Sequence, residues 1–163
     1  IKDISVRNQV LVSMLLQTGV RRTEICNIKV TNVDLKNNWI YLEHTKTNSP
    51  RYIFFDDTLK EKISTLIKPD SVFLFTSKGN CALSPSTLDS IFERMKKRLN
   101  IKMLSPHLLR HTFATYVLRN GGNLEEVRLL LGHASYQMTQ RYLHLLQDEL
   151  KLTSIRYNPM SSL

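Results

Sequence analysis

The sequence predicts a mixed α+β fold that is mostly helical: a helical bundle with a small three-stranded antiparallel sheet. Apolar residues recur at helical spacing near the N-terminus and over most of the chain after residue 84. Residues 33–55 instead hold short extended runs separated by polar turns, which is typical of strands. The 163 residues fit one domain, and no repeat, low-complexity segment or linker divides them.

Two helices are expected before the sheet. Val6, Val10 and Met14 recur at helical spacing, and Gly19 is a stop signal for that helix. A second, short helix is predicted over about residues 22–28, opened by Thr18-Gly19.

The sheet is predicted as a meander with two hairpins. Asn37-Asn38 forms a turn, and residues 39–42 are strand-like in residue type. The polar turn at 45–50 then leads into an apolar run at 51–55. We therefore expect Lys46 at the tip of the second hairpin.

Five further helices are predicted from their capping residues. A Ser, Asp or Asn side chain ahead of a helix accepts a hydrogen bond from a backbone N–H of the first turn. Such starts occur at Asp56 or Asp57, Ser84-Pro85, Ser105-Pro106, Asn123 and Ser135. The first four end near residues 67, 99, 119 and 132, whereas residues 72–75 form an apolar run too short to assign.

The chain is basic, with 23 Lys and Arg against 14 Asp and Glu, a net charge of +9. Seven basic residues and one acidic residue fall between positions 91 and 119, including the run Lys96-Lys97-Arg98. This run is a solvated helix face that phosphates would favour, so nucleic acid is the expected partner. A generic solubilising surface is the competing interpretation of the charge.

Other classes of protein are excluded by what the sequence lacks. No run of about 18 apolar residues is present, so no membrane-spanning helix is expected. The first residues do not resemble a signal peptide. Cys26 and Cys81 are too few for a disulfide framework or a zinc knuckle, which favours a reducing, cytosolic setting.

Three short motifs carry candidate chemistry. His107, Arg110 and His111 are neighbours near the start of one predicted helix, where free N–H groups favour an anion such as phosphate. Gly132 permits a turn that would place His133 in a cleft. Arg21 opens a helix with Glu24 three residues later. Each motif alone also fits a structural role. His107 and His111 lack an obvious third ligand, so no metal site is predicted.

Together these motifs resemble the tyrosine recombinase, or phage integrase, family. The matching segments are Thr-Gly-Val-Arg-x-x-Glu at 18–24, Ser-Pro-His-Leu-Leu-Arg-His-Thr-Phe-Ala-Thr at 105–115, and Leu-Gly-His at 131–133 with a tyrosine nine residues on. The resemblance covers nearly the whole chain. The six positions that match the family's catalytic set are Arg21, Lys46, His107, Arg110, His133 and Tyr142. Arg22 and Met138 depart from the residues common at those places.

The resemblance implies a role for each of these residues. Tyr142 would be the nucleophile that forms a 3′-phosphotyrosyl bond, and Arg21 and Arg110 would hold the two non-bridging oxygens. His107 and His133 would hydrogen-bond the phosphate, His107 also handling the tyrosine's proton, and Lys46 would protonate the departing 5′-oxygen. Glu24 would brace Arg21, and His111 would pack behind the site as support. The family needs no metal, ATP or other cofactor.

The resemblance also implies an activity and a context. The chain would be the catalytic domain (1–163) of a site-specific recombinase or integrase of a mobile element or prophage, acting in the bacterial cytoplasm on the nucleoid. Its partner would be double-stranded DNA, on which members form homotetramers. We expect the 163 residues to lack the family's N-terminal core-binding domain, and this fragment alone is then expected to be a monomer or weak oligomer that binds DNA weakly. A type IB topoisomerase-like enzyme and a non-catalytic DNA-binding relative are the alternatives. The apolar segment after Tyr142 fits either core packing or docking on a neighbouring protomer.

Overall fold

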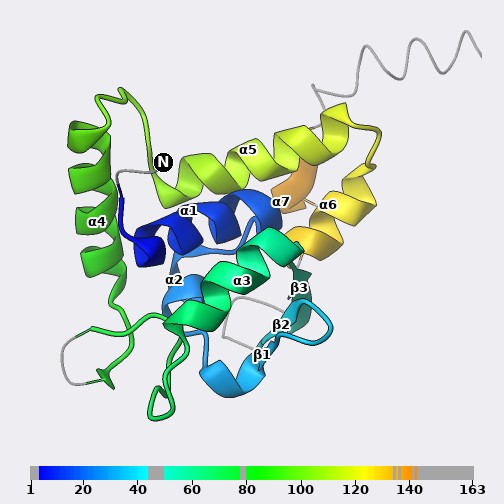
Figure 1. The fold of residues 1–163 in the computed structure, drawn as a ribbon. Helices are drawn as coiled ribbons and strands as arrows, with labels where there is room; N and C mark the ends of the chain where they lie inside the picture. The colour runs from blue at the N-terminus through cyan, green and yellow to red at the C-terminus, as the bar shows by residue number, and fades with distance from the viewer. Residues whose placement is uncertain are drawn as a thin grey trace, which may run out of the picture.

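The computed structural model describes residues 4–43, 50–77, 80–133, 135, 137–140 and 142. Lys46 and the segment after Tyr142, to which the sequence assigns roles, lie outside these residues. The strands are β1 (Val33–Asp34), β2 (Trp39–Leu42) and β3 (Arg51–Phe54). The helices are α1 (Val6–Thr18), α2 (Arg22–Cys26), η1 (Val30–Asn32), α3 (Asp57–Leu66), α4 (Pro85–Arg98), α5 (Pro106–Arg119), α6 (Leu124–Leu131) and α7 (Gln137–Gln140) (Figure 1).

The three strands form the predicted antiparallel meander, in the order β1-β2-β3. Ile40 on β2 pairs with Ile53 on β3, and both side chains are buried. On the opposite face, the Trp39 and Tyr52 rings meet edge to face with centroids 4.8 Å apart. Because side chains alternate along a strand, the sheet has an aliphatic inner face and an aromatic outer face.

Side-chain caps fix the starts of four helices where the sequence predicts them. Ser84, Ser105 and Asn123 each accept a hydrogen bond from the backbone N–H three residues on, and Asp56 does so at α3. Asn123 and Glu126 form the predicted capping box at α6. These signals are local, which is why the sequence alone reveals them.

Helix α2 ends at Cys26, two residues earlier than predicted. After Asn27 the chain extends and pairs with the apolar run that the sequence left unassigned. Leu74 donates its backbone N–H to Ile28 at 2.8 Å, and Val30 donates its own to Val72 at 2.9 Å. The non-local pairing supplies hydrogen bonds that would otherwise come from a further helical turn.

Two clusters of buried apolar side chains form the core. The larger surrounds α1, whose Val10, Leu11, Met14 and Leu15 are completely buried against α3, α5 and the sheet. The smaller joins α5, α6 and the segment after α7, and it includes Tyr142. α5 packs on both α1 and α6 through Leu109, Ala114 and Leu118, which leaves Tyr116 67% exposed.

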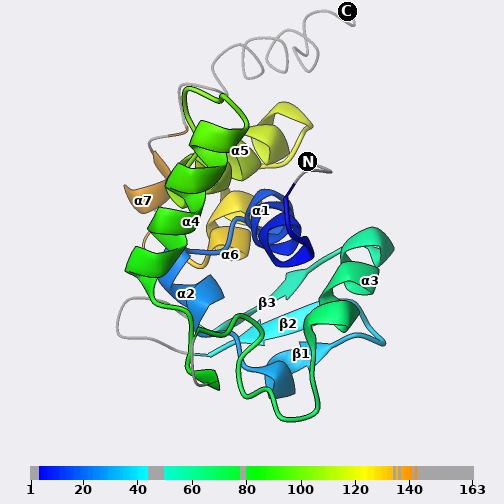
Figure 2. The same ribbon diagram turned by 60° about the vertical axis from the view of Figure 1, so that its left-hand side comes forward.

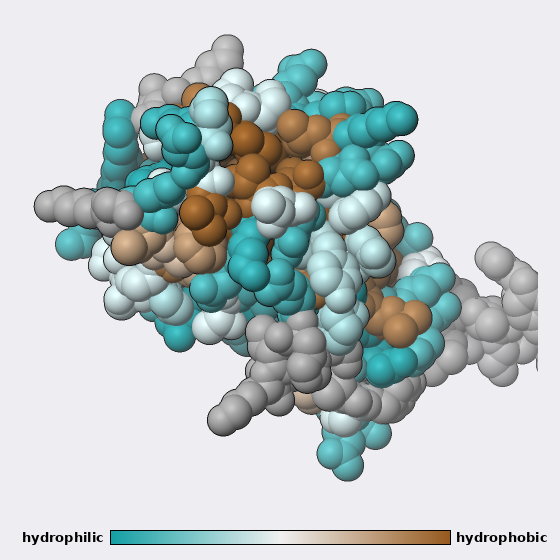
Figure 3. Space-filling view, turned by 90° about the horizontal axis from the view of Figure 1, so that it is seen from below, coloured by the Kyte–Doolittle hydropathy of each residue, from teal (hydrophilic) through white to brown (hydrophobic). Residues whose placement is uncertain are grey.

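Helices α3 and α4 lie on opposite sides of the molecule when it is turned to the view of Figure 2. α3 lies beside the sheet, whereas α4 contacts α2. From below, apolar side chains reach the surface within a rim of hydrophilic ones (Figure 3). Within the described residues, no helix has the length and apolar character needed to cross a bilayer.

Candidate active site

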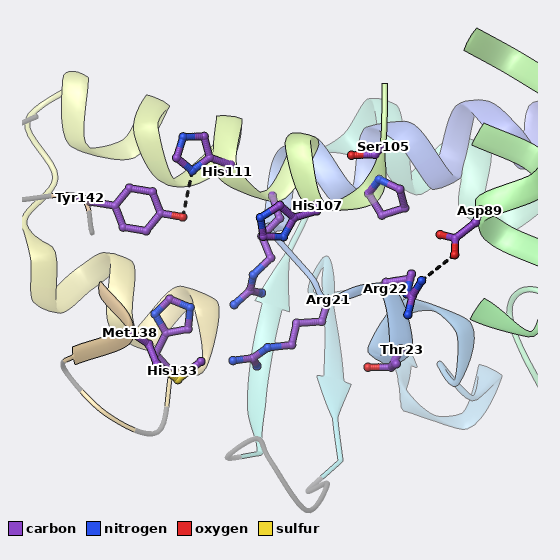
Figure 4. Close-up of a pocket in the computed structure, with 12 residues that line it drawn as sticks. Arg21, Arg22, Thr23, Asp89, Ser105, His107, His111, His133, Met138 and Tyr142 are labelled. Atoms are coloured by element: carbon purple, nitrogen blue, oxygen red, sulfur yellow. Dashed lines mark hydrogen bonds and ion pairs between the residues drawn. The ribbon is translucent and has the colours of Figure 1, made fainter. Parts of the chain in front are cut away.

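A cavity of about 560 Å³ opens where α2, α4, α5 and the end of α6 meet. Its lining is basic and aromatic in composition: Arg21, Arg22, Thr23, Asp89, Ser105, Pro106, His107, Arg110, His111, His133, Met138 and Tyr142. Figure 4 shows His111 and Tyr142 at one end, Arg22 and Asp89 at the other, and Arg21 and His107 between them. Five of the six predicted catalytic residues thus line one cavity; the sixth, Lys46, falls outside the described part of the chain.

Arg21 is half-buried immediately before α2. Its guanidinium donates to the backbone oxygen of Gly132 through both terminal nitrogens, at 3.2 Å, and Nη1 is 3.3 Å from Oε1 of Glu24. Burial lowers the pKa of Arg21, which the charge of Glu24 opposes. A guanidinium held in this way presents a fixed cation at the cavity wall.

Arg110 is the second guanidinium and is buried. It donates to the backbone oxygens of Gly19 and of Leu131, the latter at 2.9 Å. Burial and then repulsion from Arg21 lower the pKa of Arg110 to about 9. The side chain therefore keeps its charge at neutral pH, and an anion in the cavity would stabilise that charge.

The two histidines of α5 point from its first two turns. Ser105 caps the helix by accepting from the backbone N–H of Leu108 at 3.1 Å, and this places His107 at the cavity, where it is exposed. His111 was expected to pack behind the site. It is instead exposed on the cavity wall, where its ring stacks on Tyr142 with centroids 5.2 Å apart and Nδ1 lies 3.4 Å from the phenol oxygen.

His133 follows α6 and is buried. Gly132 ends the helix with φ of +63°, and this left-handed turn directs the next residue inward. His133 Nδ1 lies 2.8 Å from the hydroxyl of Thr139, a completely buried residue of α7 that the sequence analysis did not single out. The backbone N–H of Tyr142 in turn donates to the backbone oxygen of Thr139 at 3.0 Å. Thr139 therefore connects the histidine with the tyrosine.

Glu24 has a second arginine partner that the sequence analysis missed. Its carboxylate accepts from the backbone N–H of Arg21 at 2.8 Å and from both terminal nitrogens of Arg51, on β3, at 2.8 and 2.9 Å. Burial alone would raise the pKa of Glu24, but the bonds and charges of Arg51 and Arg21 hold it below its ordinary value. An arginine beginning an edge strand gives no sequence signal of such a role.

The remaining predicted residues lie at or beyond the rim. Arg22 forms an exposed ion pair with Asp89 of α4 at 2.6 Å. Lys96, Lys97 and Arg98 occupy the last turn of α4 and do not line the cavity; Lys96 pairs with Glu93 at 2.9 Å.

The site is suited to binding one tetrahedral anion. Guanidinium groups match phosphate oxygens in geometry and keep their charge, and imidazoles add further hydrogen bonds. No group of three or more His, Cys, Asp or Glu side chains that could hold a metal ion occurs among the described residues. Tyr142 lines the same cavity, and a tyrosine phenol is one of the side-chain groups that can serve as a nucleophile.

Residues 1–149 match the model of the Phage integrase family. The chain is 35% identical over 148 residues to tyrosine recombinase XerA of Saccharolobus solfataricus, covering 89% of this chain and 48% of that protein. A crystal structure of XerA recombinase superposes with a TM-score of 0.77 at 33% identity, covering 95% of this chain and 59% of that one. XerH bound to difH substrate shares the fold, with a TM-score of 0.72 at 24% identity over 91% of this chain and 47% of that one. The chain spans about half the length of the curated relatives it matches.

Proposed function

The chain belongs to the phage integrase family, and from this premise we propose that it cleaves and rejoins DNA strands in site-specific recombination. One observation carries the proposal: two guanidiniums, each anchored to a backbone oxygen at the end of α6, share a cavity with a tyrosine and three imidazoles. This set matches the needs of a metal-independent attack on a phosphodiester, which are a nucleophile, charge neutralisation and proton transfer.

In the proposed reaction the phenol oxygen of Tyr142 attacks the scissile phosphorus. The new bond joins tyrosine to the 3′-phosphate, and the bond from phosphorus to the 5′-oxygen breaks. Arg21 and Arg110 neutralise the two non-bridging oxygens, while His107 and His133 donate hydrogen bonds to them. Attack by the released 5′-hydroxyl of a partner strand reverses these steps and reseals the DNA, with the bond energy retained in the phosphotyrosine.

Two proton transfers complete the scheme. The phenol has an ordinary pKa of about 10 and must lose its proton as it attacks. His107 is assigned this role, and His111 is a second acceptor since its Nδ1 lies 3.4 Å from the phenol oxygen. Lys46 is assigned the donation of a proton to the 5′-oxygen, on the basis of the family motif.

Double-stranded DNA is the proposed partner. The net charge of +9 favours a polyanion, and XerH, which has the same fold, was solved on its difH substrate. We assign residues 1–163 to the catalytic domain and expect four copies to assemble on two recombining sites in the bacterial cytoplasm. Light scattering with and without a DNA site measures that assembly, and a monomer on DNA at all concentrations would contradict it.

The test is covalent capture on a nicked suicide substrate, from which the cleaved fragment escapes so that the phosphotyrosine persists. We expect the complete natural protein to form an adduct that resists detergent, and Tyr142→Phe to form none. Tyr116→Phe is the matched control, because Tyr116 is 67% exposed on α5 and does not line the cavity. An adduct that survives Tyr142→Phe would refute the assignment.

The same protein separates the alternatives. A recombinase joins strands from two sites, whereas a type IB topoisomerase-like enzyme forms the adduct and relaxes supercoils at one site. A non-catalytic relative binds DNA and forms no adduct. Strand-exchange and relaxation assays run in parallel therefore assign the chain to one of the three classes.

A further inference from the structure

We propose that Arg51 is a positioning residue for this site: it occupies both carboxylate oxygens of Glu24 and so leaves the Arg21 guanidinium available to the phosphate. The inference rests on the proposed function and adds a third arginine to it. Arg51 is not among the residues that line the cavity, so it acts through Glu24 rather than on the substrate.

The distances show which arginine holds Glu24. Nη1 and Nη2 of Arg51 lie 2.8 and 2.9 Å from the two carboxylate oxygens, a two-pronged pairing. Arg21 reaches the same carboxylate with one side-chain nitrogen, at the longer distance of 3.3 Å. Arg51 therefore satisfies most of the charge of Glu24, and Arg21 remains only loosely engaged by it.

The surrounding structure leaves Arg51 little freedom to move. Its side chain is only 8% exposed, and its Nε donates to the backbone oxygen of Leu130 at 2.9 Å. A Cβ atom at Gly132 would lie 2.6 Å from its Nη1, so the glycine provides the space that the guanidinium occupies. The backbone oxygen of Gly132 also accepts hydrogen bonds from Arg21. Arg51 therefore packs against the same turn that anchors Arg21.

Without Arg51, Glu24 would be a buried carboxylate with Arg21 as its neighbouring cation. Its side chain is 3% exposed, and a buried charge without a close partner is strongly unfavourable. We expect Arg21 to move into the vacated two-pronged pairing, where its donors no longer face the phosphate. The loss of cleavage would then depend on the negative charge of Glu24.

This dependence separates positioning from general stabilisation. If Arg51 only held the fold together, Arg51→Gln would lower the melting temperature but leave the cleavage rate of the folded, DNA-saturated protein unchanged. If Arg51 keeps Glu24 away from Arg21, removing the charge of Glu24 releases Arg21 and restores cleavage. A double-mutant cycle measures this coupling directly.

The experiment compares Arg51→Gln, Glu24→Gln and the double variant in the complete natural protein. Single-turnover adduct formation at saturating suicide substrate gives the cleavage rate, and fluorescence anisotropy gives the DNA Kd. Arg128→Gln is the matched control. Arg128 also donates to a backbone oxygen at the end of α6, that of His133, but no bond joins it to Glu24. If Arg51→Gln unfolds below the assay temperature, Arg51→Lys replaces it under the same criteria. This variant keeps the positive charge but loses the two-pronged pairing with Glu24.

We expect Arg51→Gln to slow cleavage by roughly 10- to 100-fold, somewhat less than the loss of a direct transition-state donor, with little change in Kd. The double variant should cleave about as fast as Glu24→Gln alone, whereas Glu24→Gln should not rescue Arg128→Gln. A rate for Arg51→Gln equal to that of the unchanged protein, or losses that multiply in the double variant, would overturn the inference. Absence of an adduct in the unchanged protein would instead overturn the proposed function itself.

Discussion

At the scale of single residues, the Thr139 hydroxyl holds the His133 ring in place. Both side chains are buried, and their polar atoms are 2.8 Å apart. The bond occupies Nδ1 and thereby fixes the orientation of the imidazole, as outer hydrogen bonds do for functional histidines in general.

We predict that Thr139→Val, which keeps the shape and removes the hydroxyl, lowers the free energy of unfolding by about 1–3 kcal/mol. Urea denaturation of the 163-residue chain measures it. Thr115→Val is the control, because the Thr115 hydroxyl is buried without a hydrogen-bond partner among the described residues, so its removal should be neutral or stabilising. Equal losses in the two variants would show that the Thr139 bond contributes nothing specific.

Glu24 makes stability depend on pH with a definite sign. Its pKa in the folded chain lies below the ordinary value of 4.5. Its contribution is therefore complete above that value and is lost as pH falls through 4.5 toward the folded pKa. We predict that Glu24→Gln is less stable than the unchanged chain at pH 7, since it leaves Arg51 without its carboxylate, and that the gap narrows by pH 3. Denaturation midpoints across this range test the sign; a gap that widens in acid would contradict it.

At the scale of elements, the C-terminal end of α6 organises the site. A helix leaves its last carbonyl groups without partners and carries partial negative charge there. Here four successive backbone oxygens each accept from a different arginine: Leu130 from Arg51, Leu131 from Arg110, Gly132 from Arg21 and His133 from Arg128. One helix end thus gathers the cations that the proposed chemistry needs.

Gly132 is the residue on which this helix end depends. We predict that Gly132→Ala lowers the free energy of unfolding by more than about 1–2 kcal/mol, because it adds left-handed strain and displaces Arg51. Gly121→Ala is the matched control, since Gly121 also has a positive φ but its Cβ would meet nothing within 4 Å. Thermal unfolding of both variants isolates the Arg51 contact as the difference. Losses of the same size would mean that Arg51 adjusts without cost.

Sequence and structure agree most closely where the signal is local. The caps at Ser84, Ser105 and Asn123 involve residues three positions apart, and the sequence displays both partners. Arg51 was missed because its partners lie 27 and 79 positions away, at Glu24 and Leu130. The family motifs predicted that Arg21, Arg110 and Tyr142 belong to one site. They carried no information on which other residues hold those side chains in position.

At the scale of the whole molecule, the basic run Lys96-Lys97-Arg98 lies at the end of α4, a helix that also borders the cavity. Asp89 lines the cavity, and Lys96 lies seven residues further on, on the same face and about 10 Å along the axis. Lys97 and Arg98 follow at the end of the helix, which points away from α3 and the sheet (Figure 2). We propose that a duplex seated on the cavity passes over this end of α4, which makes these three side chains our candidates for backbone contacts.

Neutralising Lys96, Lys97 and Arg98 to Gln should therefore weaken DNA binding and make it less sensitive to salt. Each lost phosphate contact reduces the slope of log Kd against log salt by about 0.9, so three contacts reduce it by up to about 3. The control is Lys60, Lys62 and Lys68 to Gln, which removes the same charge from the side of the molecule that carries α3. Because that variant changes net charge equally but touches no proposed contact, it should leave the slope nearly unchanged. Identical slopes for the two variants would show that DNA affinity depends only on the net charge of the protein. The proposed DNA path along α4 would then be wrong.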